Sequence, residues 1–123
     1  MLTTEGKNSH KLAGIFSAEV VSNKNLLGRG VAVFIDNVIY GGDAAFYYKG
    51  KCRYGDDNSF SAAVMIVDYS GRANSMFGPL KTGHLTLRGN INDQGFTLGG
   101  NLEGSPNSTI IINLKRLEGL VAA

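Results

Sequence analysis

Residues 26–40 read LLGRGVAVFIDNVIY, two apolar segments rich in β-branched residues that are separated by Asp36 and Asn37. Because Asn and Asp tolerate positive φ angles, a two-residue link of this kind predicts a β-hairpin. Apolar and polar residues alternate in the first segment with the period of two that is typical of strands. The hairpin therefore predicts an all-β protein.

The same pattern recurs along the chain, and turn residues interrupt it at intervals of about ten residues. In residues 13–22, for example, Phe16 and Val20 fall on one face of a strand, while Ser17 and Glu19 fall on the other. Helical periodicity is almost absent. The eight expected strands are residues 13–22, 26–35, 38–40, 44–54, 60–69, 84–91, 96–102 and 108–117.

Eight sequential antiparallel strands must protect two sheet edges, and closure into an up-and-down barrel does so. A barrel of about eight strands encloses a space that side chains or one small ligand can fill. We therefore expect an eight-stranded antiparallel up-and-down barrel, with an open sandwich as the alternative. Residues 70–80, SGRANSMFGPL, lack a period of two and are expected to form a short loop or a single helical turn.

The 123 residues are enough for one domain with a substantial core. We expect a flexible polar tail at 1–11, the barrel at 12–118 and a C-terminal tail at 119–123. A net charge of +2 with scattered Lys and Arg residues gives no electrostatic sign of direct nucleic-acid binding. The N-terminal residues lack the apolar core of a signal peptide, and no apolar run reaches the roughly 20 residues of a membrane helix. We therefore expect a cytoplasmic protein with no membrane association.

The segment VIYGGDAAFYYKG, residues 38–50, contains Gly41-Gly42-Asp43, which has three interpretations. A phosphate-binding loop would need the glycines to open a helix, whereas the residues that follow have the pattern of a strand. The Gly-Gly-Asp-Glu-Phe hairpin of nucleotide cyclases needs a second acid next to the aspartate, where this chain has Ala44. We favour a bulge or strand bend in which glycine supplies unusual dihedral angles and Asp43 caps exposed amides.

Few residues could carry catalysis or bind a metal. The two histidines, His10 and His84, have no nucleophile near them in sequence. Two histidines and one cysteine, Cys52, are also poor material for a transition-metal site. We therefore expect neither an enzyme nor a cofactor. Cys52 lies within an expected strand as a packed or half-exposed thiol, and a lone free thiol favours a reducing compartment. On a regular strand, Tyr47 and Tyr48 point to opposite faces, one inward and one outward.

Three stretches of the chain resemble the GrlR family, small negative regulators named from the control of type III secretion in enteric bacteria. They are GIFSAEV at 14–20, GRGVAVFIDNVIYGGDAAFYYKGKC at 28–52, and the late glycine-spaced strands that end in LKRL at 114–117. The resemblance extends from about Leu12 to Leu117. Its most specific positions are structural residues, namely Gly41, Gly42, Asp43, Tyr48 and Gly50.

The resemblance implies a lipocalin-like barrel with an apolar interior that works as a homodimer. It also implies that the protein binds a helix-turn-helix transcriptional activator and keeps it off DNA. The family recognises its partner partly through an acidic surface turn. The equivalent turn here contains Tyr54, Asp56 and Asp57, which keeps two carboxylates.

Two functions follow from these observations. The first is a dimeric regulator, with Ile110, Ile111 and Ile112 as candidates for the dimer interface, because a strand that is apolar on both faces is expected to be buried on both. The alternative is a carrier of a small apolar ligand such as a lipid inside the barrel. In that case Met76 and Phe77 would plug the mouth.

Overall fold

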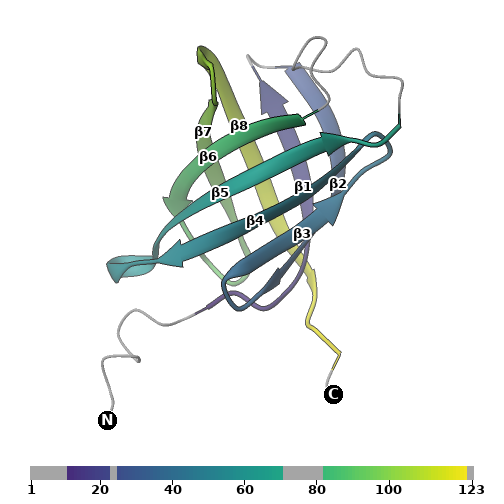
Figure 1. Ribbon diagram of the computed structural model, residues 1–123. Coiled ribbons are helices and arrows are strands. Elements are labelled where there is room, and N and C mark those ends of the chain that lie inside the picture. Colours follow the sequence, from purple (N-terminus) through teal and green to yellow (C-terminus); the bar gives the residue numbers. More distant parts are fainter. Residues whose placement is uncertain (1–10, 23–24, 71–81, 122–123) are drawn as a thin grey trace.

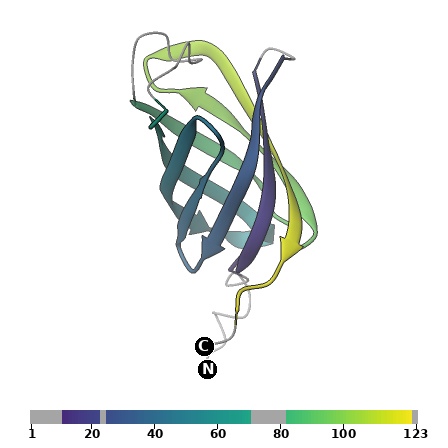
Figure 2. The same cartoon turned by 90° about the vertical axis from the view of Figure 1, so that its right-hand side faces the viewer.

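The computed structural model is a closed barrel in which each strand pairs antiparallel with the next and the last pairs with the first (Figure 1, Figure 2). The structure describes residues 11–22, 25–70 and 82–121. The expected eight-stranded up-and-down barrel is confirmed. The elements are β1 Gly14–Ser22, β2 Asn25–Ile35, β3 Val38–Gly42, β4 Phe46–Tyr54, the 3-10 turn η1 Asp56–Asn58, β5 Ser59–Asp68, β6 Thr82–Asn90, β7 Gly95–Leu102 and β8 Ser105–Glu118.

The Asp36-Asn37 link forms the predicted hairpin. Asp36 has a φ angle of 51°, and the strands on either side pair from Ile35 and Val38 onward. Two strands exceed their expected lengths by two residues or more, because β3 continues through Gly42 and β8 begins at Ser105. The candidate plug residues at 76 and 77 lie outside the described residues.

Pairing between β1 and β8 closes the barrel. The paired residues run from Ile15 with Glu118 to Ser22 with Ile110, along the whole length of β1. Both strands therefore satisfy the backbone groups that an open sheet would leave at its edges. The start of β1 and the end of β8 consequently lie side by side at one end of the barrel (Figure 1).

A cluster of aromatic rings fills the interior at that end. Phe16, Phe34, Phe60 and Phe96 pack with ring centroids 5.2 to 6.3 Å apart in edge-on or tilted arrangements. Such aromatic pairs are favourable beyond the apolar area that they bury. Leu12 is also fully buried, and its backbone N–H donates a hydrogen bond of 3.1 Å to the hydroxyl of Tyr54. The segment before β1 thereby covers the phenylalanine cluster.

The other half of the interior is lined by smaller side chains, including Ala18, Ala32 and Val64. Within the described residues, the cavity that they leave has a volume of about 40 Å³. Small-molecule pockets have volumes of roughly 300 Å³ or more. The described interior is thus filled largely by the protein's own side chains, and its cavity is far smaller than a lipid would need.

We predict that Phe34→Ala lowers the free energy of unfolding by about 3–5 kcal/mol, as large-to-small substitutions in packed cores do. Phe34 contacts the other three rings of the cluster, so its loss opens a cavity in the middle of it. Urea denaturation measures the change. Lys115→Ala, at an exposed position of β8, is the control and should cost less than about 1 kcal/mol. Equal losses in the two variants would contradict a core centred on these rings.

Candidate functional site

The link between β3 and β4 is a tight turn built on Asp43. One carboxylate oxygen, Oδ1, accepts hydrogen bonds from the backbone N–H groups of Ala45 and Phe46, each at 2.9 Å. The backbone N–H of Asp43 donates to the carbonyl of Phe46, also at 2.9 Å. Asp43 therefore caps the amides of the turn residue Ala45 and of Phe46, the first residue of β4, and it fixes the direction in which β4 begins.

Two tyrosines attach the same residue to the barrel wall. The hydroxyl of Tyr48 donates a hydrogen bond to Oδ2 of Asp43, and the hydroxyl of Tyr69 donates to the Asp43 carbonyl at 2.7 Å. Burial, followed by the hydrogen bond to Asp43, raises the pKa of Tyr48 far above its usual value. Tyr48 consequently stays protonated and acts as a donor. The Asp43 carboxylate thus accepts three hydrogen bonds, from the amides of Ala45 and Phe46 and from the hydroxyl of Tyr48, and these bonds hold the turn in place.

Gly41 and Gly42, which precede Asp43, lie so close to neighbouring backbone that a side chain would not fit. The expectation of unusual dihedral angles at Gly41 and Gly42 is wrong, because among the described glycines only Gly14 and Gly104 have positive φ angles. A Cβ atom on Gly42 would lie 2.9 Å from the carbonyl oxygen of Phe46. A Cβ atom on Gly41 would collide with the backbone of β2. Both residues are extended and allow neighbouring backbones to approach closely.

Two glycines of β2, Gly28 and Gly30, make room for the Asp43 turn, a role that was not predicted from the sequence. A Cβ atom on Gly28 would lie 3.2 Å from Oδ2 of Asp43, and one on Gly30 would lie 2.9 Å from the Asp43 Cβ. Both pair with inward-facing residues of β1, so the turn folds over the inner rim of the barrel. The Gly-x-Gly spacing, which puts two glycines on one face of a strand, was the available signal. Gly50 of β4 similarly allows close approach to Ala63 of β5.

The candidate partner-binding residues do not form one surface. Tyr54 is half-buried, accepts the hydrogen bond from Leu12 and donates one of 3.0 Å to the carbonyl of Asp36, so it is part of the packing at the closed end. Asp56 and Asp57 are exposed in the turn η1. Only the two carboxylates of this set face solvent.

The isoleucine run of β8 is also divided between the two faces of the barrel wall. Ile110 is 1% exposed and belongs to the core, and Ile112 lines the interior cavity. Ile111 points outward and is half-buried. Of these three candidates, only Ile111 is placed where a second subunit could contact it.

Cys52 and the tyrosine pair of β4 are placed as the alternation of the strand predicts. Cys52 is buried, and burial raises the pKa of its thiol to about 12. Because the thiolate is the reactive form of cysteine, Cys52 is a packing residue. Tyr48 points inward and Tyr47 points outward, so this prediction is confirmed.

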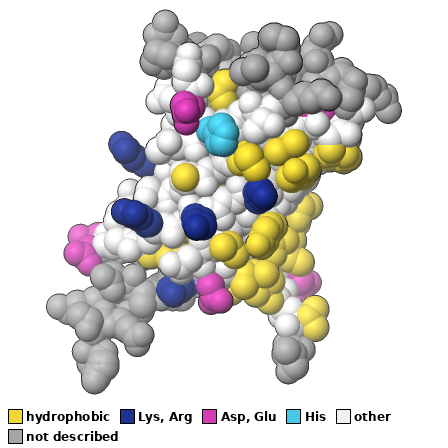
Figure 3. All heavy atoms as spheres, viewed as in Figure 1, with side chains coloured by type: hydrophobic (Ala, Val, Ile, Leu, Met, Phe, Trp, Pro, Cys, Tyr) yellow, Lys and Arg dark blue, Asp and Glu magenta, His cyan; other side chains and the backbone are white. Residues whose placement is uncertain are grey.

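An apolar surface lies on the outer wall of β2 to β4. The strand register puts Val31, Gly42, Tyr47 and Val67 in one row, and Val33, Tyr40, Lys49 and Met65 in the next. Ile35 pairs with Val38 in a third row. We call the apolar members of these rows on β2, β3 and β4, together with Tyr69, the apolar wall. Figure 3 shows hydrophobic side chains gathered at this side of the molecule.

Several members of the apolar wall are strongly exposed. Val31, Ile35, Tyr40, Tyr47 and Tyr69 have exposed fractions between 39% and 58%. Tyr47 and Tyr69 lie against each other, with ring centroids 6.4 Å apart, and Tyr69 is held by its hydrogen bond to the Asp43 turn. The turn thus positions the aromatic end of this surface.

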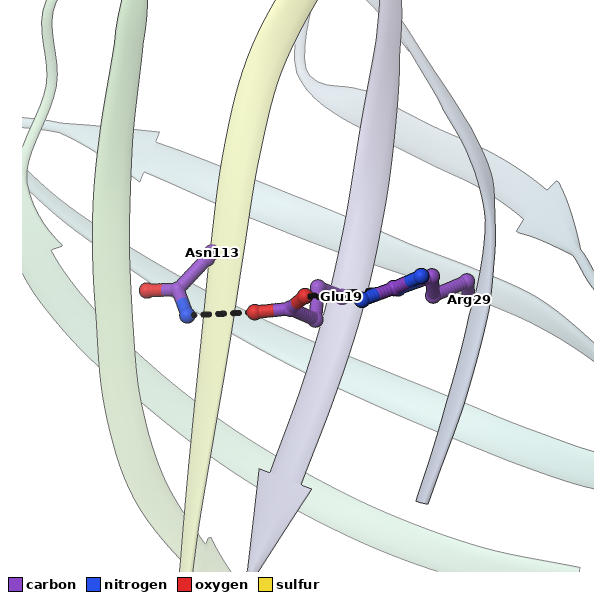
Figure 4. Close-up of polar contacts among 3 residues, drawn as sticks. All are labelled: Glu19, Arg29 and Asn113. Atoms are coloured by element: carbon purple, nitrogen blue, oxygen red, sulfur yellow. Dashed lines mark hydrogen bonds and ion pairs between the residues drawn. The ribbon is translucent and has the colours of Figure 1, made fainter. Parts of the chain in front are cut away.

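The opposite wall carries a row of polar side chains that bind one another. Thr97 donates to Oδ1 of Asn113 at 2.8 Å, and Asn113 donates through Nδ2 to Oε1 of Glu19 at 3.1 Å. Oε2 of Glu19 pairs with the guanidinium of Arg29 at 3.3 Å, and Figure 4 shows Asn113, Glu19 and Arg29 in line. With Thr97, the row crosses β7, β8, β1 and β2. Exposed pairs of this kind add little stability, but they leave this wall polar.

No protein-family model and no curated protein matches this sequence. Within the described ranges, no group of three or more His, Cys, Asp or Glu residues is arranged to hold a metal ion. The described residues also contain no helix that is long and apolar enough to cross a membrane. The candidate site is therefore defined by the Asp43 turn and the apolar wall that it supports.

We predict that Asp43→Ala lowers the free energy of unfolding by about 2–4 kcal/mol, because it leaves partly buried donors without an acceptor. Tyr48→Phe should cost about 1 kcal/mol, since it removes one of the three donors to the carboxylate. The double variant should cost less than the sum, because both substitutions remove the same hydrogen bond. Thermal and urea denaturation of the four proteins measure this coupling. Strict additivity would contradict a bond between these two side chains.

Proposed function

We propose that the protein is a non-enzymatic regulator that works by binding other proteins, and that it is a homodimer whose subunits meet through the apolar wall. The exposed apolar wall is the observation that supports this proposal. Contiguous apolar patches of this kind, bordered by polar residues, mark interaction surfaces on folded proteins. Exposed aromatic residues such as Tyr40 and Tyr47 are enriched in the cores of such interfaces.

The resemblance to the GrlR family supplies the proposed target. A regulator of that kind binds a helix-turn-helix transcriptional activator and keeps it off DNA, so the proposal implies a cytoplasmic protein. The exposed carboxylates of Asp56 and Asp57 lie in a separate turn beyond β4, away from the apolar wall. A dimer formed through the apolar wall would therefore leave that turn free for the activator.

We predict that the wild-type protein sediments as a dimer at about 10 µM and that Tyr40→Arg makes it monomeric, because the new charge would be desolvated in an apolar interface. Thr97→Arg, on the exposed polar wall, is the matched control and should remain dimeric. Sedimentation velocity separates the two states, and thermal denaturation verifies that each variant is folded. A monomeric wild type, or a dimer that Tyr40→Arg leaves intact, would contradict this interface.

The regulatory role has its own test. Affinity capture from the source cells with the tagged protein should recover a helix-turn-helix protein, identified by mass spectrometry. Addition of the purified barrel should then lower the affinity of that protein for its operator DNA, as measured by a mobility-shift assay. Asp56→Asn together with Asp57→Asn should weaken this effect. An activator that binds its operator equally well with and without the barrel would rule out sequestration.

A further inference from the structure

A furrow lined by basic side chains runs along the outer face of β5. Its floor consists of the small outward residues Ser61 and Ala63. The register places Arg53 of β4 and Arg88 of β6 on either side of Ser61, and Lys51 beside Ala63. The middle section of the furrow has a volume of about 670 Å³. We call this surface the basic furrow.

A second section continues the same trough along β5, in the direction of Met65. This section has a volume of about 440 Å³, and its lining includes Lys49, Met65 and His84. Lys51, Ala63 and Thr86 line both sections, which makes them continuous. Figure 3 shows Lys and Arg side chains spread over this front wall of the barrel, beside the hydrophobic surface.

Among the described residues, the cations of the basic furrow have no anionic partner. Lys49, Lys51, Arg53 and Arg88 are all exposed, and none forms an ion pair or a side-chain hydrogen bond with any residue in the described ranges. On the polar wall, by contrast, Arg29 is paired with Glu19. Four positive charges around small floor residues thus face solvent with their hydrogen-bonding capacity unused.

Acidic residues mark both ends of this positive surface. Glu103 lines the end next to His84, and Asp56 and Asp57 lie in the turn that follows β4 beyond Arg53. Between these ends, Lys49 to Arg53 spans about 13 Å of strand, at roughly 3.3 Å per residue. The positive surface is therefore short, and it matches an anionic segment of only about four or five extended residues.

We propose that the basic furrow binds a short, extended, acidic peptide segment of a partner protein. A carboxylate above Ser61 would lie between Arg53 and Arg88, where two guanidinium groups and a hydroxyl can donate to it. Further carboxylates would meet Lys49 and Lys51, and apolar side chains of the segment would lie on Ala63 and Met65. The inference rests on the proposed role as a protein-binding regulator, but it does not depend on the dimer.

Two observations favour a peptide over a nucleic acid. The cations on β4 and β6 are separated by two strand spacings, about 10 Å, which accommodates one extended polypeptide chain. Acidic residues at both ends would repel a phosphate backbone that continued past the furrow. Proteins that hold single-stranded nucleic acids also present successive aromatic side chains to the bases, whereas the floor of this furrow is Ser61 and Ala63.

The probe for the test is a fluorescein-labelled peptide of about eight residues, in which pairs of glutamates alternate with single leucines so that it is extended and acidic. Fluorescence anisotropy measures its binding to the full-length protein at low salt. The double variant Arg53→Glu, Arg88→Glu should weaken binding about tenfold or more, because each reversal replaces an attraction with a repulsion. Lys115→Glu, exposed on β8, is the matched control and should leave the affinity unchanged.

Ala63→Glu is a second variant, which blocks the floor of the furrow with one exposed substitution if the double variant does not fold. Loss of peptide binding in either folded variant, with Lys115→Glu unaffected, supports the proposal. No binding by the folded wild type overturns it, as does equal binding of a peptide with glutamine in place of glutamate. Tighter binding of an oligothymidylate probe that the furrow variants abolish would replace the peptide with a nucleic acid. Sedimentation of the same proteins separates these outcomes from a failure of the proposed dimer.

Discussion

The backbone hydrogen bonds between β1 and β8 close the barrel, and the rest of the structure depends on this closure. Closure with eight strands fixes the interior volume, so the inward side chains must fill a space of set size. Four phenylalanines fill one end, and glycines in β2 and β3 let the Asp43 turn fold over the rim of the other. The apolar interior is therefore used for packing, and the surfaces available for recognition are on the outside.

Strand β4 divides that outer surface into two chemically different parts. Its outward residues run from Tyr47 through Lys49 and Lys51 to Arg53, from an aromatic group to three cations. The apolar wall lies mainly on the side of β2 and β3, and the basic furrow lies on the side of β5 and β6. The Asp43 turn begins β4 and so sets the register of both surfaces. A partly buried hydrogen-bond network at one rim of the barrel thus lies where both outer surfaces begin.

Alternation and turn chemistry were sufficient to predict the strands and the Asp36-Asn37 hairpin, because both are local properties of the chain. The capping role of Asp43 also followed from its place beside a turn. The contact of that turn with Gly28 and Gly30 could not be predicted, because these glycines approach Asp43 only after β2 and β3 have paired. The outer surfaces were missed for the same reason. Residues such as Val31 and Tyr40 are ordinary strand residues until the register brings them together.

The first and last strands place both chain ends of the barrel at the same rim. Gly14 begins β1 and Glu118 ends β8 at the end that the phenylalanines close, whereas the Asp43 turn lies at the opposite rim (Figure 1). A domain joined before β1 or after β8 would therefore be attached at the rim that the phenylalanine cluster closes. The apolar wall and the basic furrow lie on the side of the barrel, away from both of these points of attachment.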